Sequence, residues 1–364
     1  MNLKRYGVAV AILATAAISL TACASNEAAP AATSSKSAAA LTGTLNGIGS
    51  SAQGAAETTW IAGIQTSNPG LTVNYDPQGS GAGRTSFIGG SADFAGSDAA
   101  LSTTELASTF VGCAAGTKAI DLPVYISPIA IAYNVAGVTA LKLDAPTIAG
   151  IFSGAIKTWN DPAIAGQNAG VNLPSAPITV VHRSDDSGTT QNFTDYLSAN
   201  APSVWTKPVS QTYPYPVGDA AKGTSGVAAA TKAAANSITY IDESGAAGLS
   251  IAQLKVGSSY VKISAAGAAA VVAASPITSG RAANDMAITI NRTDTSKNAW
   301  PMVLVSYLIA CQQYKDAAQG ALVKAYANYV VSPEAQKAAA TQAGSAPLST
   351  DLASKVSAAI ATIK

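Results

Sequence analysis

The sequence predicts an α/β protein with two lobes. Three observations carry this prediction. Short β-like runs alternate with helix-like runs, which is typical of α/β folds with mainly parallel sheets. Hydrophobic residues make up 48% of the chain and charged residues only 11%, so it can bury a sizeable core. The alternating pattern extends from residue 41 to residue 364, beyond the usual domain size of about 100–150 residues, which favours two lobes.

The expected elements follow in chain order. Apolar and β-branched runs predict strands at 41–47, 71–75, 128–133, 178–182 and 238–242. Alanine-rich or lightly charged segments predict helices at 57–67, 85–90, 145–152, 190–197, 227–235 and 318–340. Loops rich in Pro and Gly punctuate the chain without marking a domain boundary.

Charge and histidine content exclude several classes of protein. Lys and Arg number 21 and Asp and Glu number 20, so the net charge of +1 lacks the basic excess of a nucleic-acid-binding protein. His182 is the single histidine, which excludes most zinc sites and most Ser-His or Cys-His mechanisms. Many Gly, Ser and Thr residues instead favour binding through hydrogen bonds.

The N-terminus is typical of an exported protein. Lys4 and Arg5 precede an apolar stretch at 7–19 that is shorter than the roughly 20 residues needed to span a bilayer. The following Leu-Thr-Ala-Cys sequence resembles the lipobox of bacterial lipoproteins, which implies cleavage after residue 22 and acylation of Cys23. An ordinary signal peptide that contains a cysteine remains an alternative. Residues 23–40 are rich in Ala, Ser, Thr and Pro and predict a flexible tether.

Two further cysteines, Cys113 and Cys311, lie in the predicted folded part. Disulfides persist in an extracytoplasmic compartment, so we expect these two residues to pair. Two buried free thiols remain the alternative, because spacing in sequence gives no distance in space.

Three glycine-rich or serine-rich turns, at 47–52, 79–83 and 183–190, each join a predicted strand to a predicted helix. The first backbone N–H groups of a helix lack partners within it, and small residues let an anion approach them. Each turn is therefore a candidate anion site. Arg183 strengthens the third turn, because its planar guanidinium suits a tetrahedral oxyanion.

Other interpretations of these turns stay open. The first imitates a dinucleotide fingerprint, with Asp76 after the second strand, or it caps a helix near Ser50 or Ser51. The second is a near miss to a nucleotide-binding P-loop, with Gln78 and Arg84 where Gly and Lys belong. A serine-hydrolase role for the third turn would need Ser187 and His182 to meet, and the turn lacks the nucleophile-elbow motif.

Two longer stretches resemble the phosphate-binding lipoproteins of phosphate-specific ABC transporters, the PstS family. They are GSGAG at 79–83 with ADFAGSDAAL at 92–101, and VHRSDDSGTT at 181–190 with FTDYL at 193–197. Supporting matches lie at 151–154, 158–161, 226–228, 238–241 and 299–301. In family order they extend from about 41 to 348, which is nearly the whole exported chain.

The resemblance implies a type II periplasmic-binding-protein fold with the ligand in the cleft between lobes. It places lobe 1 at 41–126 plus 298–364 and lobe 2 at 127–297, with Cys113 and Cys311 in the same lobe. The implied phosphate contacts are Ser51, the backbone of Ala52, Ser80, Asp98, Arg183, Ser187, Gly188 and Thr189, with Asp185 holding Arg183. The chain departs from the family at Ala52, often aromatic there, and at Asp186, commonly Gly.

Two of these residues have a specific expected role. A carboxylate only accepts hydrogen bonds, so Asp98 would pair with a proton on phosphate and repel fully deprotonated sulfate. Arg183 would supply the countercharge. The alternatives are a helix cap before Leu101 for Asp98, and a surface ion pair with Asp185 or Asp186 for Arg183.

The resemblance also implies the function. The chain would be an extracytoplasmic solute-binding protein, lipid-anchored at the outer face of the cytoplasmic membrane. It would capture inorganic phosphate and deliver it to the permease and ATPase subunits of an ABC transporter, without cofactor, metal or catalytic step. A phosphoesterase and a receptor for sulfate or molybdate remain alternatives. Neither a metal-ligand cluster nor an activated nucleophile is visible in the sequence, and Asp98 argues against sulfate and molybdate.

Overall fold

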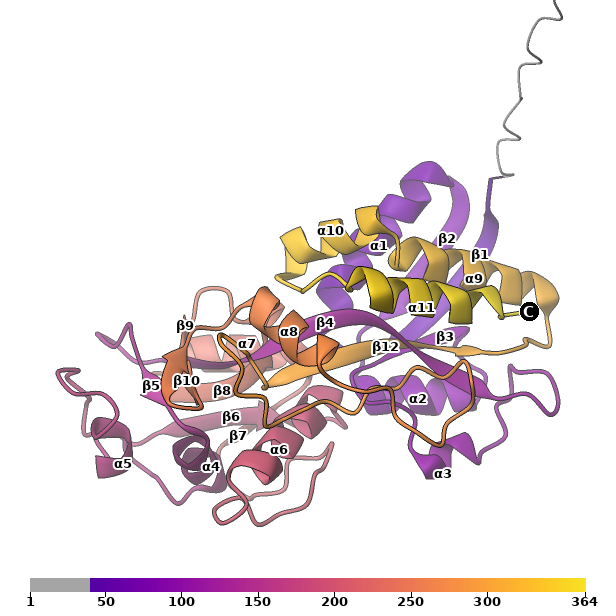
Figure 1. Cartoon of the computed structure of the whole chain (residues 1–364). Coiled ribbons are helices and arrows are strands. Elements are labelled where there is room, and N and C mark those ends of the chain that lie inside the picture. Colours follow the sequence, from indigo (N-terminus) through magenta and orange to yellow (C-terminus); the bar gives the residue numbers. More distant parts are fainter. Residues whose placement is uncertain (1–39) are drawn as a thin grey trace, which may run out of the picture. The chain divides into compact units, whose positions relative to one another are not determined.

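The computed structural model describes residues 40–364, drawn in colour in Figure 1. The predicted signal peptide, Cys23 and nearly all of the predicted tether lie outside these residues. Within the described part of the chain, none of the helices has the length and apolar character needed to cross a membrane.

The strands and helices alternate as the sequence predicts. The strands are β1 (Thr42–Gly49), β2 (Gly70–Asp76), β3 (Phe94–Ser97), β4 (Ala119–Asn134), β5 (Lys142–Leu143), β6 (Thr179–Arg183), β7 (Asp219–Ala221), β8 (Ser237–Asp242), β9 (Ser250–Ile251), β10 (Gln253–Val256), β11 (Ser259–Val261) and β12 (Val303–Cys311). The α-helices are α1 (Gly54–Ser67), α2 (Ser80–Ile88), α3 (Thr103–Leu106), α4 (Ala145–Ser153), α5 (Pro162–Ala165), α6 (Gly188–Asn200), α7 (Gly223–Ala233), α8 (Ala265–Ala273), α9 (Ala317–Val330), α10 (Pro333–Ala343) and α11 (Thr350–Ala361). A short 3-10 helix occupies Glu243–Gly245.

One large sheet has the strand order β2-β1-β3-β12-β4-β8-β6-β7, with β9 beside β4. Parallel pairs lie at both ends, where β1 pairs with β2 and β3, and β6 pairs with β7 and β8. In the middle, β12 runs antiparallel to β3 and β4, and β4 runs antiparallel to β8. The prediction of mainly parallel sheets is therefore wrong at the centre, because β4 and β12 connect the two ends in opposite directions.

Strand β4 passes from β12 to β8 along its length, and near its end it also pairs with β9. Pro128 still pairs with Val303 of β12, whereas Ile129 pairs with Asp242 of β8. We call β1, β2 and β3 with α1, α2, α9, α10 and α11 the first lobe, and β6, β7 and β8 with α4, α6 and α7 the second lobe. The predicted two-lobed α/β architecture is confirmed. The residue boundaries near 126 and 297 stay predictions, although the partner change in β4 lies close to the first of them.

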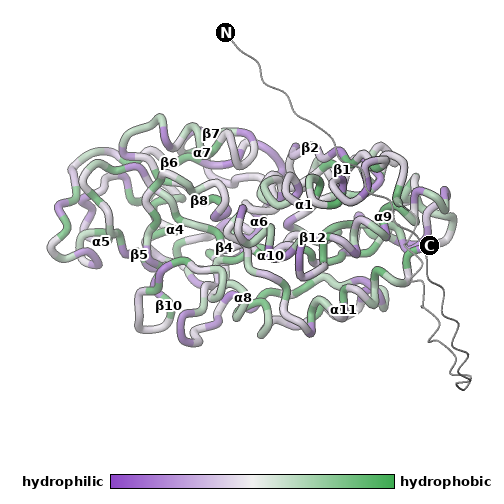
Figure 2. Tube along the Cα trace, turned by 90° about the horizontal axis from the view of Figure 1, so that it is seen from above, coloured by the Kyte–Doolittle hydropathy of each residue, from purple (hydrophilic) through white to green (hydrophobic). Residues whose placement is uncertain are grey.

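The two long strands form the centre of the core. Every residue of β12 is buried, as is every residue of β4 except the last, Asn134. Figure 2 shows mainly hydrophobic residues along both strands. Helices α8 and α11 both pack against β4, and α9 packs against β12. A strand that is covered on both faces is a continuous apolar run and lacks the alternating pattern by which strands are recognised in a sequence. For this reason the sequence predicted only 128–133 of β4 and left β12 unassigned.

The predicted helix at 318–340 is two helices. Ser332 caps α10 by accepting a hydrogen bond from the Ala335 N–H, and Pro333 occupies the first turn. Proline lacks the N–H that a continuous helix would need at this position. The break lets α10 pack against α1 while α9 packs against β1.

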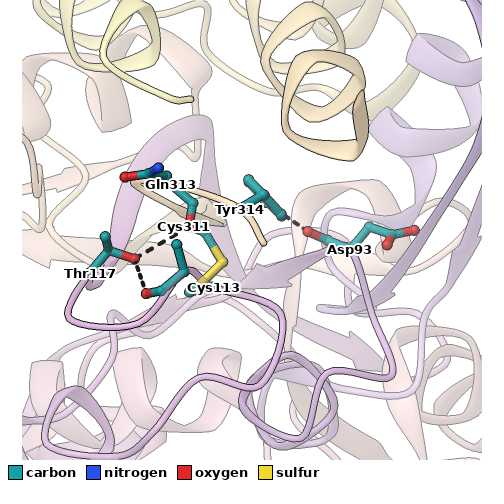
Figure 3. The surroundings of a disulfide bond; sticks show 7 residues. Asp93, Cys113, Thr117, Cys311, Gln313 and Tyr314 are labelled. Atoms are coloured by element: carbon teal, nitrogen blue, oxygen red, sulfur yellow. Dashed lines mark hydrogen bonds between the residues drawn. A yellow bond between two sulfur atoms is a disulfide. The ribbon is translucent and has the colours of Figure 1, made fainter. Parts of the chain in front are cut away.

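The predicted pairing of Cys113 with Cys311 is confirmed, since a disulfide joins them with a Cα–Cα distance of 5.3 Å (Figure 3). Cys311 ends β12, and Cys113 lies in the loop that leads to β4. Nearby, the Thr117 hydroxyl donates to the carbonyl oxygen of Ala114 at 2.7 Å, and the Tyr314 hydroxyl donates to that of Asp93 at 2.8 Å. The disulfide therefore ties the end of β12 to the loop that precedes β4.

Candidate functional site

Four helices begin around two buried carboxylates. Helices α1, α2 and α6 begin beside Asp98, which directly follows β3, and α7 begins beside Asp242, the last residue of β8, which accepts from the Thr224 hydroxyl at 2.8 Å. Helices α1 and α2 belong to the first lobe, and α6 and α7 belong to the second. The turns before α1, α2 and α6 are the three that the sequence singled out, and the turn before α7 is a fourth. Because the N-terminal end of a helix carries unpaired N–H groups and a partial positive charge, this convergence favours a bound anion.

The Asp98 side chain joins the two lobes. Its carboxylate accepts hydrogen bonds from the Ser50 hydroxyl and, at 3.0 Å, from the Thr189 hydroxyl. The Asp98 N–H donates to the Ser80 hydroxyl oxygen at 3.1 Å, and the Asp98 carbonyl oxygen accepts from the Asn192 amide at 2.7 Å. Burial raises the pKa of Asp98, and the hydrogen bonds from hydroxyl groups together with the charge of Arg183 oppose that rise.

A glycine allows the two lobes to meet at this point. A Cβ atom on Gly188 would lie 2.7 Å from the Asp98 Cβ and 2.7 Å from the Ser80 Oγ, which is closer than a side-chain Cβ approaches atoms to which it is not bonded. Gly188 is also the first residue of α6. The glycine of the third turn is therefore required by the close approach of the first turn of α6 to the first lobe.

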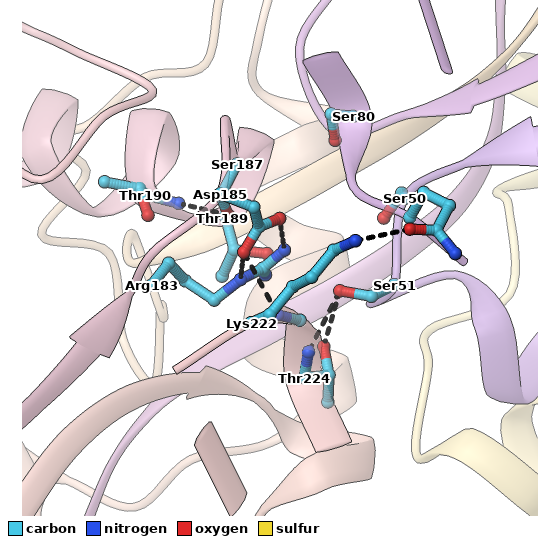
Figure 4. A network of polar contacts seen from close by, with 12 residues as sticks. Ser50, Ser51, Ser80, Arg183, Asp185, Ser187, Thr189, Thr190, Lys222 and Thr224 are labelled. Carbon is cyan, nitrogen blue, oxygen red and sulfur yellow. Dashed lines mark hydrogen bonds and ion pairs between the residues drawn. The ribbon is translucent and has the colours of Figure 1, made fainter. Parts of the chain in front are cut away.

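Arg183 ends β6 and is 4% exposed, so its charge is nearly removed from water. Its Nε donates to the Asp185 carboxylate at 2.7 Å, and one terminal nitrogen donates to the other carboxylate oxygen (Figure 4). Asp185 also accepts from the N–H of Gly223, at the start of α7, at 3.0 Å. Burial by itself would lower the pKa of Arg183, but the hydrogen bond and charge of Asp185 raise it, so the cation is held in one orientation.

We call the N-terminal ends of α1, α2, α6 and α7, with the turns before them, the ring. Further polar groups of the ring contact one another. The Ser51 oxygen accepts from the Thr224 N–H at 3.0 Å and lies 3.2 Å from the Thr224 hydroxyl, which joins α7 to the turn before α1 (Figure 4). The Ser187 oxygen accepts from the Thr190 N–H at 3.2 Å, so its hydroxyl proton stays available to a ligand. The Ala52 N–H donates to the Ser50 hydroxyl oxygen at 3.1 Å.

A cavity of about 830 Å³ opens beside this ring and shares Ser51 and Thr224 with it. Lys222 and Lys232 are the charged members of the described residues that line it. Lys222, which precedes α7, donates to the side-chain carbonyl of Gln78 in the first lobe at 2.5 Å. An anion would therefore approach the ring through a positively charged mouth.

The structure decides several alternatives. Asp98 does not cap a helix before Leu101, because Asp121 accepts from the Leu101 N–H and Ser102 caps α3. The Arg183–Asp185 pair exists, but it is buried rather than at the surface. Arg183 pairs with Asp185 and not with Asp186, whose carboxylate lies 4.0 Å from Arg84.

The geometry does not support the serine-hydrolase interpretation, because His182 and Ser187 are engaged with other partners. The His182 ring stacks on Tyr213 with ring centroids 3.9 Å apart, and its Nδ1 lies 2.9 Å from the Arg183 carbonyl oxygen. Ser187 is instead engaged as the N-cap of α6. Among the described residues, no group of three or more His, Cys, Asp or Glu side chains could hold a metal ion.

Sequence reasoning missed four residues of the site: Ser50, Asn192, Thr224 and its partner Asp242. Ser50 adjoins Ser51 in the first turn, and its role could have been suspected from that position. Thr224 follows Gly223 at the start of α7, three residues before the predicted start of that helix. Asn192 lies on α6 between two residues of the family-like stretch, and no signal in the sequence distinguished it.

A buried network links the start of α1 to β12. The Gln53 amide donates to the Glu57 carboxylate at 2.7 Å, and the Ser306 hydroxyl donates to the Gln53 carbonyl oxygen at 2.7 Å. The Tyr326 hydroxyl donates to the other Glu57 oxygen at 2.5 Å. Burial raises the pKa of Glu57 from 4.5 to about 7, and the hydrogen bonds from Tyr326 and Gln53 limit the rise.

This network predicts a pH-dependent stability. Because the pKa of Glu57 is higher in the folded state, its contribution is fully present below about pH 4.5 and is lost as the pH rises through about 7. In the wild type the free energy of unfolding should fall between pH 5 and pH 8, and the replacement Glu57→Gln should reduce that fall by about 3 kcal/mol. Urea unfolding across that range measures it. The matched change Glu334→Gln, at an exposed carboxylate, should leave the slope as in the wild type, and equal slopes in both variants would contradict the assignment.

Comparisons with known proteins agree with this geometry. Residues 32–334 match the family model described as a PBP superfamily domain. The chain is 40% identical over 338 residues to the phosphate-binding protein PstS 3 of Mycobacterium leprae, with 90% of each chain covered. It is 36% identical over 379 residues to the phosphate-binding protein PstS 2 of Mycobacterium tuberculosis, with 100% of each covered.

Solved structures show the same fold. A phosphate-binding protein from Stenotrophomonas maltophilia superimposes with a TM-score of 0.69 at 21% identity, covering 87% of this chain and 94% of that one. A high-affinity periplasmic phosphate-binding protein solved with bound phosphate gives 0.67 at 24% identity, covering 87% and 93%. With the curated relatives above 30% identity over nearly their whole length, the chain belongs to the PBP superfamily and, within it, to the PstS family.

Proposed function

We propose that this protein captures inorganic phosphate between its two lobes. The observation that carries the proposal is the composition of the site: one buried cation, Arg183, faces the buried acceptor Asp98 among hydroxyl and N–H donors at four helix starts. A second buried carboxylate, Asp242, accepts from the Thr224 hydroxyl at 2.8 Å. The proposed phosphate contacts are Ser51, Ala52, Ser80, Asp98, Arg183, Ser187, Gly188 and Thr189. Asp185 supports Arg183, Ser50 donates to Asp98, and Thr224 donates to Ser51. The Ala52 N–H would have to share its hydrogen with Ser50 and the ligand.

The charge pattern favours a protonated tetrahedral anion. Hydroxyl and N–H donors stabilise oxygen atoms without the cost of burying many full charges. Asp98 keeps lone pairs beyond those used by Ser50 and Thr189, so it can accept a hydrogen bond from the proton of phosphate. Sulfate has no such proton at neutral pH and would place a bare oxygen against the carboxylate.

The function that follows is transport rather than catalysis. The names of the relatives and the proposed lobes, 41–126 plus 298–364 and 127–297, support a receptor that closes on phosphate and presents it to permease and ATPase subunits of an ABC transporter. The proposal involves no catalytic step, cofactor or nucleic acid. The sequence supports a lipid anchor at Cys23 on the outer face of the cytoplasmic membrane, and intact-mass analysis of membrane-extracted protein would test it.

Isothermal titration of a soluble chain that starts near Leu41 tests the function. Phosphate carried through purification must first be removed by unfolding and refolding, and phosphate and sulfate are then titrated separately. Tight one-to-one binding of phosphate with much weaker binding of sulfate is expected. Equal binding of both ions, or of neither, would overturn the proposal.

A further inference from the structure

A second buried arginine lies near the site and is not used by the proposed phosphate contacts. Arg84 belongs to α2 in the first lobe and is 3% exposed. Its Nε donates to the Glu105 carboxylate at 2.8 Å, and one terminal nitrogen donates to the Ser97 hydroxyl oxygen at 3.0 Å. Both partners belong to the first lobe's side of the cleft, so these two bonds fix the guanidinium on that side.

Through Ser97, Arg84 supports the segment that carries Asp98. The Ser97 hydroxyl donates to the Ala99 carbonyl oxygen at 2.6 Å and is fully buried. Asp98 lies between these two residues in the chain. The position of the Asp98 backbone therefore depends on a hydroxyl group that Arg84 holds in place.

The remaining terminal nitrogen of Arg84 reaches into the second lobe. It donates to the Gln211 side-chain carbonyl at 2.7 Å, and Gln211 lies in the loop between α6 and β7. The Gln211 backbone carbonyl accepts from the Ser187 N–H at 3.0 Å, directly before α6. A single guanidinium thus connects the Asp98 segment of one lobe with the Ser187 turn of the other.

Asp186 adds to this contact. Its backbone carbonyl accepts from the Gly81 N–H in α2 at 3.0 Å, and its carboxylate lies 4.0 Å from Arg84. A Cβ on Gly81 would lie 2.2 Å from an Asp186 carboxylate oxygen, so the glycine is what lets Asp186 sit against α2. The negative charge of Asp186 is therefore directed at Arg84.

We propose that Arg84 is a positioning residue that latches the two lobes in the closed form. Its bonds to Glu105 and Ser97 lie within one lobe and persist when the lobes separate, whereas its bond to Gln211 exists only when they meet. The latch therefore stabilises the closed form and slows phosphate release. That the released ligand is phosphate rests on the proposed function. The latch itself rests only on the contact that Arg84 makes across the lobes.

The variant Gln211→Ala removes the cross-lobe bond and leaves the first-lobe partners of Arg84 intact. Its matched control is Gln78→Ala, which removes the other glutamine that accepts from a cation across the cleft, the exposed Lys222. Release is measured by chasing bound radiolabelled phosphate with unlabelled phosphate. A hydrogen bond to a buried charge predicts release about tenfold faster in Gln211→Ala, and the exposed pair predicts a change under about twofold in Gln78→Ala.

A double-mutant cycle assigns the effect to Arg84. Arg84→Lys should also speed release, and adding Gln211→Ala to it should produce little further change, because both substitutions remove the same bond. Equal release rates in Gln211→Ala, Gln78→Ala and wild type would overturn the latch, as would full additivity in the cycle.

Small-angle X-ray scattering separates failure of the latch from failure of the function, because it needs no ligand. A larger radius of gyration in Gln211→Ala than in Gln78→Ala supports the latch even if the wild type fails to bind phosphate in titration. Equal radii together with equal release rates contradict the latch while leaving phosphate binding intact. Equal radii in a wild type that binds no phosphate contradict both proposals.

Discussion

Replacement Arg183→Gln is expected to weaken phosphate binding by about 30-fold or more, measured by isothermal titration. Truncating one partner of a buried, hydrogen-bonded charge pair costs about 2–5 kcal/mol, and each 1.4 kcal/mol corresponds to tenfold in affinity. Arg183 is the buried cation of the ring, and glutamine retains a donor but not the charge. An affinity within threefold of the wild type would show that Arg183 is not the countercharge.

The control must separate binding from folding. Arg183→Gln leaves Asp185 as a buried, partly unpaired carboxylate, which by itself lowers the free energy of unfolding. The double variant Arg183→Gln with Asp185→Asn removes both charges and should recover stability in thermal unfolding. Phosphate affinity should stay low in the double variant, because the ligand still lacks its cation.

Replacement Asp98→Asn is expected to narrow the ratio of phosphate to sulfate affinity by about 10- to 100-fold. The carboxamide can donate to a bare sulfate oxygen, whereas it accepts the phosphate proton more weakly than a carboxylate does. The two hydroxyl groups of Ser50 and Thr189 donate to different oxygens of Asp98. The carboxamide has the same size, its oxygen can accept from one hydroxyl and its NH2 can donate to the oxygen of the other, so the contact between the lobes should survive. Titration of each ion into wild type and variant gives the ratio.

A matched control is Asp76→Asn, which changes an exposed carboxylate at the end of β2. The Asp76 side chain accepts from the Gln78 amide at 2.8 Å and makes no contribution to the ring around Asp98. The affinity ratio should stay at its wild-type value in this variant. An unchanged ratio in Asp98→Asn would assign anion selection to another residue, even if phosphate binding itself persisted.

Local features of the site could be predicted from the sequence because their chemistry lies within a few residues. Arg183, Asp185 and the cap at Ser187 share one turn, and the third turn's small residues predict a helix start next to a cation. The pairing of the two cysteines of the folded part could be predicted because the predicted export signal implies a compartment where disulfides persist.

The tertiary structure decided what lies opposite these turns. Ser50 meets Asp98 across 48 residues of chain, Asn192 meets it across 94, and Ser51 meets Thr224 across 173. Such pairs leave no local pattern, because any serine, threonine or asparagine has the same intrinsic preferences wherever its partner lies. The same holds for Gln211, which became a partner of Arg84 only through folding.

The sequence by itself determined the alternation of strands and helices, the glycine-rich helix starts and the family to which they point. Only the tertiary structure decided that β4 and β12 run antiparallel through the centre, and that four helix starts converge on the buried carboxylates of Asp98 and Asp242. The physical reason is that hydrophobic periodicity and turn chemistry act between neighbours in sequence. Strand order and cross-lobe contacts depend instead on which buried surfaces and polar groups satisfy one another in the whole fold.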